Sequence, residues 1–308
     1  MEDLLLVRNI IISFYGKFQK IINILLKLVL GLVVYNTIFK IDMHLSVFDV
    51  VFNGKYSTIC IFALVMFFVV FSTQINLLLI GISTALAYSN FVFISIVLLL
   101  IFITIFVGYI RLSEREAMFI LLTYIAFTIK MPYIVPLIGG LFFSATIIFP
   151  ITIGTYIWYL IGNMPQFCLM VESEEYLSLD ILNRFAYTLE KIVGGTLSDT
   201  AFFASAFTLI FMALVIQIIR MIDIDRREVV GVLSATLGGL VLIFISFIIN
   251  NIGANLIVNL FMCLLSGVIA VAVSVLDNLT DIESTEHVKF QDDDNIYYVK
   301  IVPKIKGD

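Results

Sequence analysis

Charged side chains are scarce in this sequence. Asp, Glu, Lys and Arg make up 13% of its 308 residues, whereas hydrophobic residues make up 61%. An ordinary soluble domain carries about twice that fraction of charged residues. The composition therefore excludes a soluble globular fold and predicts a membrane protein.

Cysteine and histidine are also rare. Of three cysteines, Cys60 and Cys263 fall within long apolar runs and only Cys168 falls outside them, so no disulfide framework is predicted. The two histidines, His44 and His287, are expected on opposite sides of the membrane. Acid-base catalysis by histidine is therefore poorly provided for.

Motifs that carry catalytic chemistry are missing as well. The sequence has no P-loop, no His-Glu-x-x-His zinc motif and no Gly-x-Ser-x-Gly elbow. Lys and Arg do not cluster and the net charge is −5, which excludes nucleic-acid partners. The acidic run Asp292 to Asp294 lacks the spaced ligands of a calcium loop, so a solvated turn is expected. We expect no enzyme, no cofactor and no metal site.

Long apolar segments fill most of the chain. A helix needs about 20 apolar residues to cross a hydrocarbon core of roughly 30 Å. No small-residue cleavage site follows the first segment, which predicts a retained span and not a signal peptide. We predict an all-α polytopic transmembrane domain over residues 1–276, followed by a polar tail over 277–308. The eight expected spans are 21–39, 57–73, 75–89, 91–110, 141–163, 200–220, 229–249 and 252–276.

The positions of Lys and Arg predict the orientation, because cytoplasmic loops retain positive charge. With the N-terminus inside, the cytoplasmic side holds eight basic residues: Arg8, Lys17, Lys20, Arg111, Arg115, Arg220, Arg226 and Arg227. The outer side holds four: Lys40, Lys55, Arg184 and Lys191. Both termini are therefore expected in the cytoplasm.

The stretch 114–140 does not fit a simple crossing. Its first part begins with a capping-box pattern, Ser113 and Glu116, and is apolar to Ile129. Lys130, Pro132, Pro136, Gly139 and Gly140 then interrupt it, and proline breaks a helix by removing an amide donor. The topology requires an odd number of crossings over 116–163. A re-entrant helical hairpin with its tip at 130–136 meets this requirement, and three short tilted crossings are the alternative. The next span is expected to be interrupted at Pro150.

Two segments outside the spans carry their own patterns. In the outer loop 164–199, apolar residues at helical spacing predict an amphipathic helix over 178–193, with Gly194 and Gly195 as its stop. In the tail, strand-like runs over 287–291 and 296–302 flank a four-residue acidic turn. A small cytoplasmic β-hairpin is expected there.

Two short stretches resemble a known group of proteins. The tail from His287 to Lys304 and the segment from Lys130 to Gly140 are similar to a family of uncharacterised multi-spanning proteins of anaerobic Gram-positive bacteria. The resemblance covers about a tenth of the chain and implies no activity. It implies a bacterial cell-membrane location.

Lys130 is the sharpest candidate for function. A charged residue within an apolar segment costs a few kcal/mol unless it meets protein, water or a partner. At the tip of a broken helix it could hold an anionic substrate or a counter-ion, as in transporters with discontinuous helices. The alternative is that it snorkels to an interface from a shallower position. Lys27, close to the cytoplasmic end of its span, is expected to snorkel.

Polar and small residues mark the remaining spans. Asn76, Asn255 and Asn259 could line a polar path, although hydrogen bonds between helices explain such residues more often. A stripe at i, i+4, i+8 is formed by Gly231, Ala235 and Gly239, and it is matched by Ser266, Ala270 and Ser274 in the following span. Close helix packing explains both stripes without a ligand.

Two classes of function remain. The first is a transporter-like protein or permease subunit, with Lys130, Pro132, Pro136, Gly139, Gly140, Asn255 and Asn259 as its pathway residues. The second is a non-catalytic membrane platform that assembles or anchors an envelope complex. The expected partners are the lipid bilayer and other membrane or cytoplasmic subunits, which would bind through the tail.

Overall fold

The computed structural model describes residues 69–109, 114–222, 226–250, 256–281, 286–291 and 296–301, with scattered positions between 17 and 67. The expected spans 21–39 and 57–73 fall largely outside these residues. Ser113, Asn255 and the acidic run Asp292 to Asp294 also lie outside them.

Helices make up most of the described chain, as predicted. Four of the described helices are long and apolar enough to cross a membrane: Ala145–Val171, Thr200–Met221, Arg227–Ile249 and Leu256–Val275. In this part of the chain α4 (Thr73–Ala87), α5 (Val92–Tyr109) and α6 (Glu114–Thr128) are shorter apolar helices. Among the described residues, four helices are long enough to cross a membrane, compared with the eight spans predicted from the sequence.

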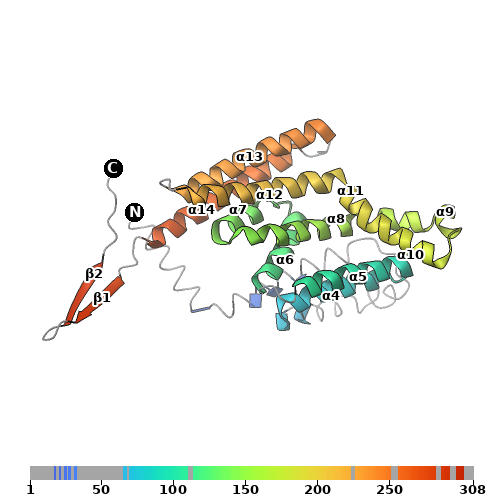
Figure 1. Ribbon diagram of the computed structural model, residues 1–308, viewed down its shortest axis with the longest axis horizontal. Coiled ribbons are helices and arrows are strands. Elements are labelled where there is room, and N and C mark those ends of the chain that lie inside the picture. Colours follow the sequence, from blue (N-terminus) through green and yellow to red (C-terminus); the bar gives the residue numbers. More distant parts are fainter. Residues whose placement is uncertain are drawn as a thin grey trace.

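The long helices lie side by side along the long axis of the molecule (Figure 1). In chain order they are α8 (Ile148–Val171), α12 (Thr200–Met221), α13 (Arg227–Asn250) and α14 (Leu256–Asp281). α12 packs against α13, and α13 packs against α14. We call the end where α12 stops and α13 starts the base end, and the end where α8 stops and α12 starts the loop end.

The short helices fill the remaining layers. α4 and α5 pack as a pair, and α6 lies between this pair and α8 (Figure 1). The nine-residue α7 (Ile134–Phe142) packs against α12, α13 and α14, and the 3₁₀ turn η1 (Ala145–Ile147) joins it to α8. Pro150 lies in the first turn of α8 and not at an interruption as predicted, because the first helical turn does not use the missing amide donor.

Three buried threonine hydroxyls in these apolar helices are satisfied locally. Thr123, Thr155 and Thr236 each donate from Oγ1 to the carbonyl oxygen four residues earlier, at 2.7 to 2.9 Å. This back-bonding removes the cost of leaving a hydroxyl unpaired in an apolar interior. Threonine can therefore occupy core positions here without marking a binding site.

The loop end carries a chain of short helices, namely α9 (Glu174–Leu177), α10 (Ile181–Leu189), the π-helix η2 (Glu190–Gly194) and α11 (Gly195–Ser198). Gly194 and Gly195 do not end the helix as predicted, since the backbone continues in helical geometry to Ser198. Ile192 is fully buried, whereas Leu182, which shares the apolar face of the predicted helix 178–193, is 83% exposed. The wider π turn shifts the register between these two residues.

The polar tail contains two strands, β1 (Glu286–Gln291) and β2 (Ile296–Ile301). They pair antiparallel, with Glu286 opposite Ile301 and Gln291 opposite Ile296. This two-stranded ladder follows the end of α14 (Figure 1).

Candidate functional site: a helical hairpin with a lysine at its tip

α6 and α7 form the two legs of a hairpin. Near the base end the Phe119 ring of α6 meets the Phe143 ring just after α7, with centroids 4.7 Å apart in an edge-to-face arrangement. From Phe119 to Ile129 the first leg rises by about 15 Å, and the nine residues of α7 return by about 14 Å. The legs therefore start and finish at the same end of the bundle, and each spans about half of a roughly 30 Å hydrocarbon core.

The first leg is seated on α8. A Cβ added at Gly154 would lie 2.7 Å from the Ile120 carbonyl oxygen and 2.7 Å from Thr123 Cβ, so only glycine allows this approach. One turn further, Tyr124 and Phe127 pack on the Trp158 ring, with centroids 5.5 and 5.9 Å away. Later residues of α6 thus contact later residues of α8, so the leg advances in the same direction as α8, toward the loop end.

The second leg is buried on nearly every side. Val135, Leu137 and Leu141 of α7 are at most 6% exposed, and they share one core cluster with α12, α13 and α14. Gly140 permits this packing, because a Cβ there would be 3.0 Å from Ile216 Cβ of α12. A helix of nine residues is too short to be stable alone in water, so its neighbours hold it.

The tip is a helix stop built around Lys130. The Lys130 amide donates to the Phe127 carbonyl at 3.0 Å, and the Met131 amide donates to the Ala126 carbonyl at 2.7 Å. This pair of bonds is the Schellman motif, which requires the residue after the helix to be left-handed. Lys130 adopts that conformation with φ of 61°, at a position where glycine is usual.

The Lys130 side chain is exposed at the tip, whereas the adjacent Pro132 and Tyr133 are buried. No hydrogen bond or ion pair joins its ammonium to another described residue. Tyr133 belongs to the same buried cluster as Cys263 of α14, which lies well inside that helix. Within the described helices α4 to α8 and α12 to α14, every other charged residue lies among the first three or last five residues of its helix, so among them Lys130 is the charge set at mid-depth.

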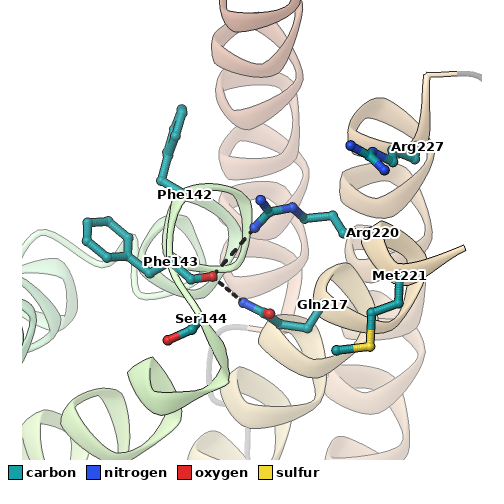
Figure 2. Close-up of a pocket in the computed structure, with 7 residues that line it drawn as sticks. All are labelled: Phe142, Phe143, Ser144, Gln217, Arg220, Met221 and Arg227. Carbon is teal, nitrogen blue, oxygen red and sulfur yellow. Dashed lines mark hydrogen bonds between the residues drawn. The ribbon is translucent and has the colours of Figure 1, made fainter.

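The base of the hairpin is held by two polar side chains of α12. Gln217 Nε2 donates to the Phe143 carbonyl at 2.5 Å and to the Gly140 carbonyl at 3.4 Å. Arg220 Nη1 donates to the Gly140 carbonyl at 3.0 Å. It also reaches the Phe143 carbonyl at 3.5 Å, beside the bond from Gln217 (Figure 2). The last carbonyls of a helix have no partner within it, and a cation near them also favours the helix dipole. Gln217 and Arg220 thus cap α7.

Among the other predicted pathway residues, Gly139 and Gly140 have packing roles in the structure. Pro136 lies in the first turn of α7, so the break covers Ile129 to Tyr133 and is shorter than the predicted tip at 130–136. A Cβ at Gly139 would come within 2.6 Å of Ile147 Cδ1. Asn259 is half-buried on α14, one turn before Cys263, and is therefore further from the base end than the tip.

The remaining polar candidates, Asn76 and Lys27, both bond a carbonyl at the start of α4. Asn76 is fully buried, and its Nδ2 donates to the Phe71 carbonyl at 3.4 Å. Lys27 donates to the same carbonyl at 3.4 Å. Phe71 directly precedes the N-cap of α4, Ser72. These bonds satisfy a backbone group at the start of α4, and they do not approach Lys130.

Both small-residue stripes lie in helix contacts. Gly231 faces Ile216 of α12, because a Cβ added at this glycine would lie 3.6 Å from Ile216 Cα, and Gly239 faces Met212 of α12. Ala235 between them is fully buried. On α14, Ser266, Ala270 and Ser274 are buried to at least 99%, and the adjacent Gly267 approaches Thr236 of α13.

Sequence patterns did not single out Gln217, and they indicated nothing about Arg220 beyond its charge. A signal was present, since Gln217 is the one amide in the apolar run 200–221 and Arg220 follows three residues later on the same helix face. Their partners are backbone carbonyls of a segment more than 70 residues earlier, which no spacing rule could identify.

Comparisons with protein-family models, curated proteins and solved structures find no match to this chain. The inference of function therefore depends on the geometry of the hairpin.

Proposed function

We propose that this chain is a multi-pass membrane protein of the transporter or permease type, in which the α6–α7 hairpin forms part of the path of an anionic solute. The observation that carries this proposal is the position of Lys130 at the tip of a hairpin that returns after about half the length of the bundle. The eight expected spans and a bacterial cell-membrane location complete the proposal.

The energetics of the tip support a water-filled path. A charged side chain at the centre of a bilayer costs about 3 kcal/mol on insertion scales, and non-helical backbone at that depth survives only against protein or water. Pro132 and Tyr133 at the tip are buried, and Lys130 is exposed on its open side among the described residues. Water on the open side would solvate the ammonium and allow it to meet an anionic group.

The orientation follows from basic residues at the two ends. Arg220, Arg226 and Arg227 lie at the base end, whereas Arg184 and Lys191 lie on the short helices of the loop end. Because cytoplasmic segments retain positive charge, we place the base end and both termini in the cytoplasm. The hairpin then enters from the cytoplasmic side.

A cysteine-accessibility experiment tests the water-filled path. In a background without Cys60, Cys168 and Cys263, Lys130→Cys should react with a small charged methanethiosulfonate reagent in membrane vesicles. The matched control is Phe207→Cys, because Phe207 is 59% exposed near the middle of the apolar helix α12. We expect the rate at position 130 to be at least tenfold higher. Equal, slow labelling at both positions would place Lys130 in lipid and overturn the proposal.

Complementation of a gene deletion separates transport from a platform role. Lys130→Met should fold, because it removes a charge from the membrane. At matched membrane abundance it should fail to complement, whereas Lys130→Arg, which keeps the charge, should complement at least in part. Full complementation by Lys130→Met would contradict a transport path through the tip and leave the membrane platform as the better hypothesis.

A further inference from the structure

A pocket opens at the base end, between the end of α7 and the α12–α13 junction. Its volume is about 390 Å³, and it is lined by Phe142, Phe143, Ser144, Gln217, Arg220, Met221 and Arg227. In Figure 2 the guanidinium groups of Arg220 and Arg227 both extend from the α12–α13 side toward the end of α7. The pocket is thus formed by segments that are about 80 residues apart in sequence.

The polar part of the pocket is suited to an anion. Its described lining residues include two guanidinium groups, one amide and one hydroxyl, and no carboxylate is among them. Arg220 bonds the backbone carbonyls through Nη1, so further N–H donors of its guanidinium remain for a ligand. Arg227 is exposed at the start of α13 and makes no side-chain hydrogen bond to another described residue. Forked guanidinium groups match the geometry of phosphate oxygens.

The rest of the pocket is apolar and open to the surroundings of the bundle. Phe142 is 44% exposed and Met221 is 82% exposed, and Ile218, one turn before Ile222 on the outside of α12, is 57% exposed. A free inorganic anion would leave this apolar part unused. A phospholipid would place its phosphate at the arginines and its glycerol and acyl chains along Phe142, Met221 and Ile218.

We propose that this pocket binds the phosphate of an anionic phospholipid headgroup at the cytoplasmic face. Basic pockets between membrane helices on this side are typical sites for such headgroups. The inference depends on the membrane placement given above but not on transport, so it can stand if the hairpin proves to carry no solute. Bound lipid would bridge α7, α12 and α13 at the point where Gln217 and Arg220 hold the hairpin.

Purified full-length protein in a neutral detergent provides the test. Short-chain phosphatidylglycerol, phosphatidylcholine and soluble glycerol 3-phosphate would be titrated separately, with thermal unfolding and native mass spectrometry as readouts. Phosphatidylglycerol should raise Tm and remain bound, and the other two should have much smaller effects. Arg227→Gln should weaken phosphatidylglycerol binding roughly fivefold, as expected for loss of one basic residue at an anionic headgroup.

Arg226→Gln is the matched control, because it removes the same charge one residue earlier and Arg226 does not line the pocket. It should bind phosphatidylglycerol as the wild-type protein does. Equal weakening by both substitutions would show a diffuse charge effect and overturn the site. Equal stabilisation by phosphatidylcholine, or a full effect of glycerol 3-phosphate, would overturn the anionic lipid as its occupant.

Discussion

The two ends of the α6–α7 hairpin are built in opposite ways. At the base, two side chains of α12 donate to the last carbonyls of α7, and the aromatic rings of Phe119 and Phe143 close the gap between the legs. At the tip, the backbone completes its own hydrogen bonds, and the charged side chain of Lys130 is exposed.

The contrast predicts that the base of the hairpin matters for stability and the tip for function. Each hydrogen bond at the base stabilises the fold, so the residues of the base are expected to matter for folding. The tip contains two energetically unfavourable features, namely a left-handed residue that is not glycine and a charge at mid-depth. No described contact offsets either of them. Such features persist in proteins mainly where they serve a function. Substitutions in each part of the hairpin test this division, and the largest effect is expected where α6 rests on α8.

Gly154→Ala should disrupt the close contact between α6 and α8. The new Cβ would lie 2.7 Å from a backbone oxygen, which cannot move without shifting α6, so we expect a loss of about 3 kcal/mol in unfolding free energy. Thermal unfolding in detergent measures this. On the same helix Gly162→Ala meets nothing within 4 Å and should be neutral or slightly stabilising. If both variants unfold alike, α6 does not approach α8 as closely as described.

Gln217→Met should weaken the base by about 2 kcal/mol. The substitution keeps the side-chain volume but removes the donor to the Phe143 and Gly140 carbonyls, and an unpaired buried carbonyl carries a desolvation penalty. Ile218→Met, at the neighbouring exposed position, is the control and should cost much less. Limited proteolysis near residue 143 should also become faster in Gln217→Met. Unchanged stability of Gln217→Met would mean that Arg220 alone is a sufficient cap.

Lys130→Gly should be more stable than Lys130→Ala by about 1 kcal/mol, because both remove the charge and only glycine relieves the positive φ. The order should reverse at Thr128, the last residue of α6, where glycine is less favourable than alanine. Thermal unfolding of the four variants gives the comparison directly. A preference for alanine at both positions would show that residue 130 is not left-handed in solution.

The membrane class, the helical character and the place where the chain breaks could all be predicted from the sequence. Scarce charge and long apolar runs leave few alternatives to helices in lipid, and Lys130 with Pro132 lies where no helix can continue unbroken. The stripe Gly231, Ala235, Gly239 could be identified in the same way, since small residues at a period of four are local information.

How the broken segment is used depends on tertiary packing. Proline alone cannot distinguish a helix stop from a first turn, and Pro136 and Pro150 both lie in first turns. Gly194 and Gly195 continue in helical geometry and do not stop the chain, because the buried Ile192 and the packing of Gly195 against Phe167 hold them there. Distant segments are joined by the caps from Gln217 and Arg220 and by the close contact of α6 with Gly154. Such contacts depend on packing that no local pattern encodes.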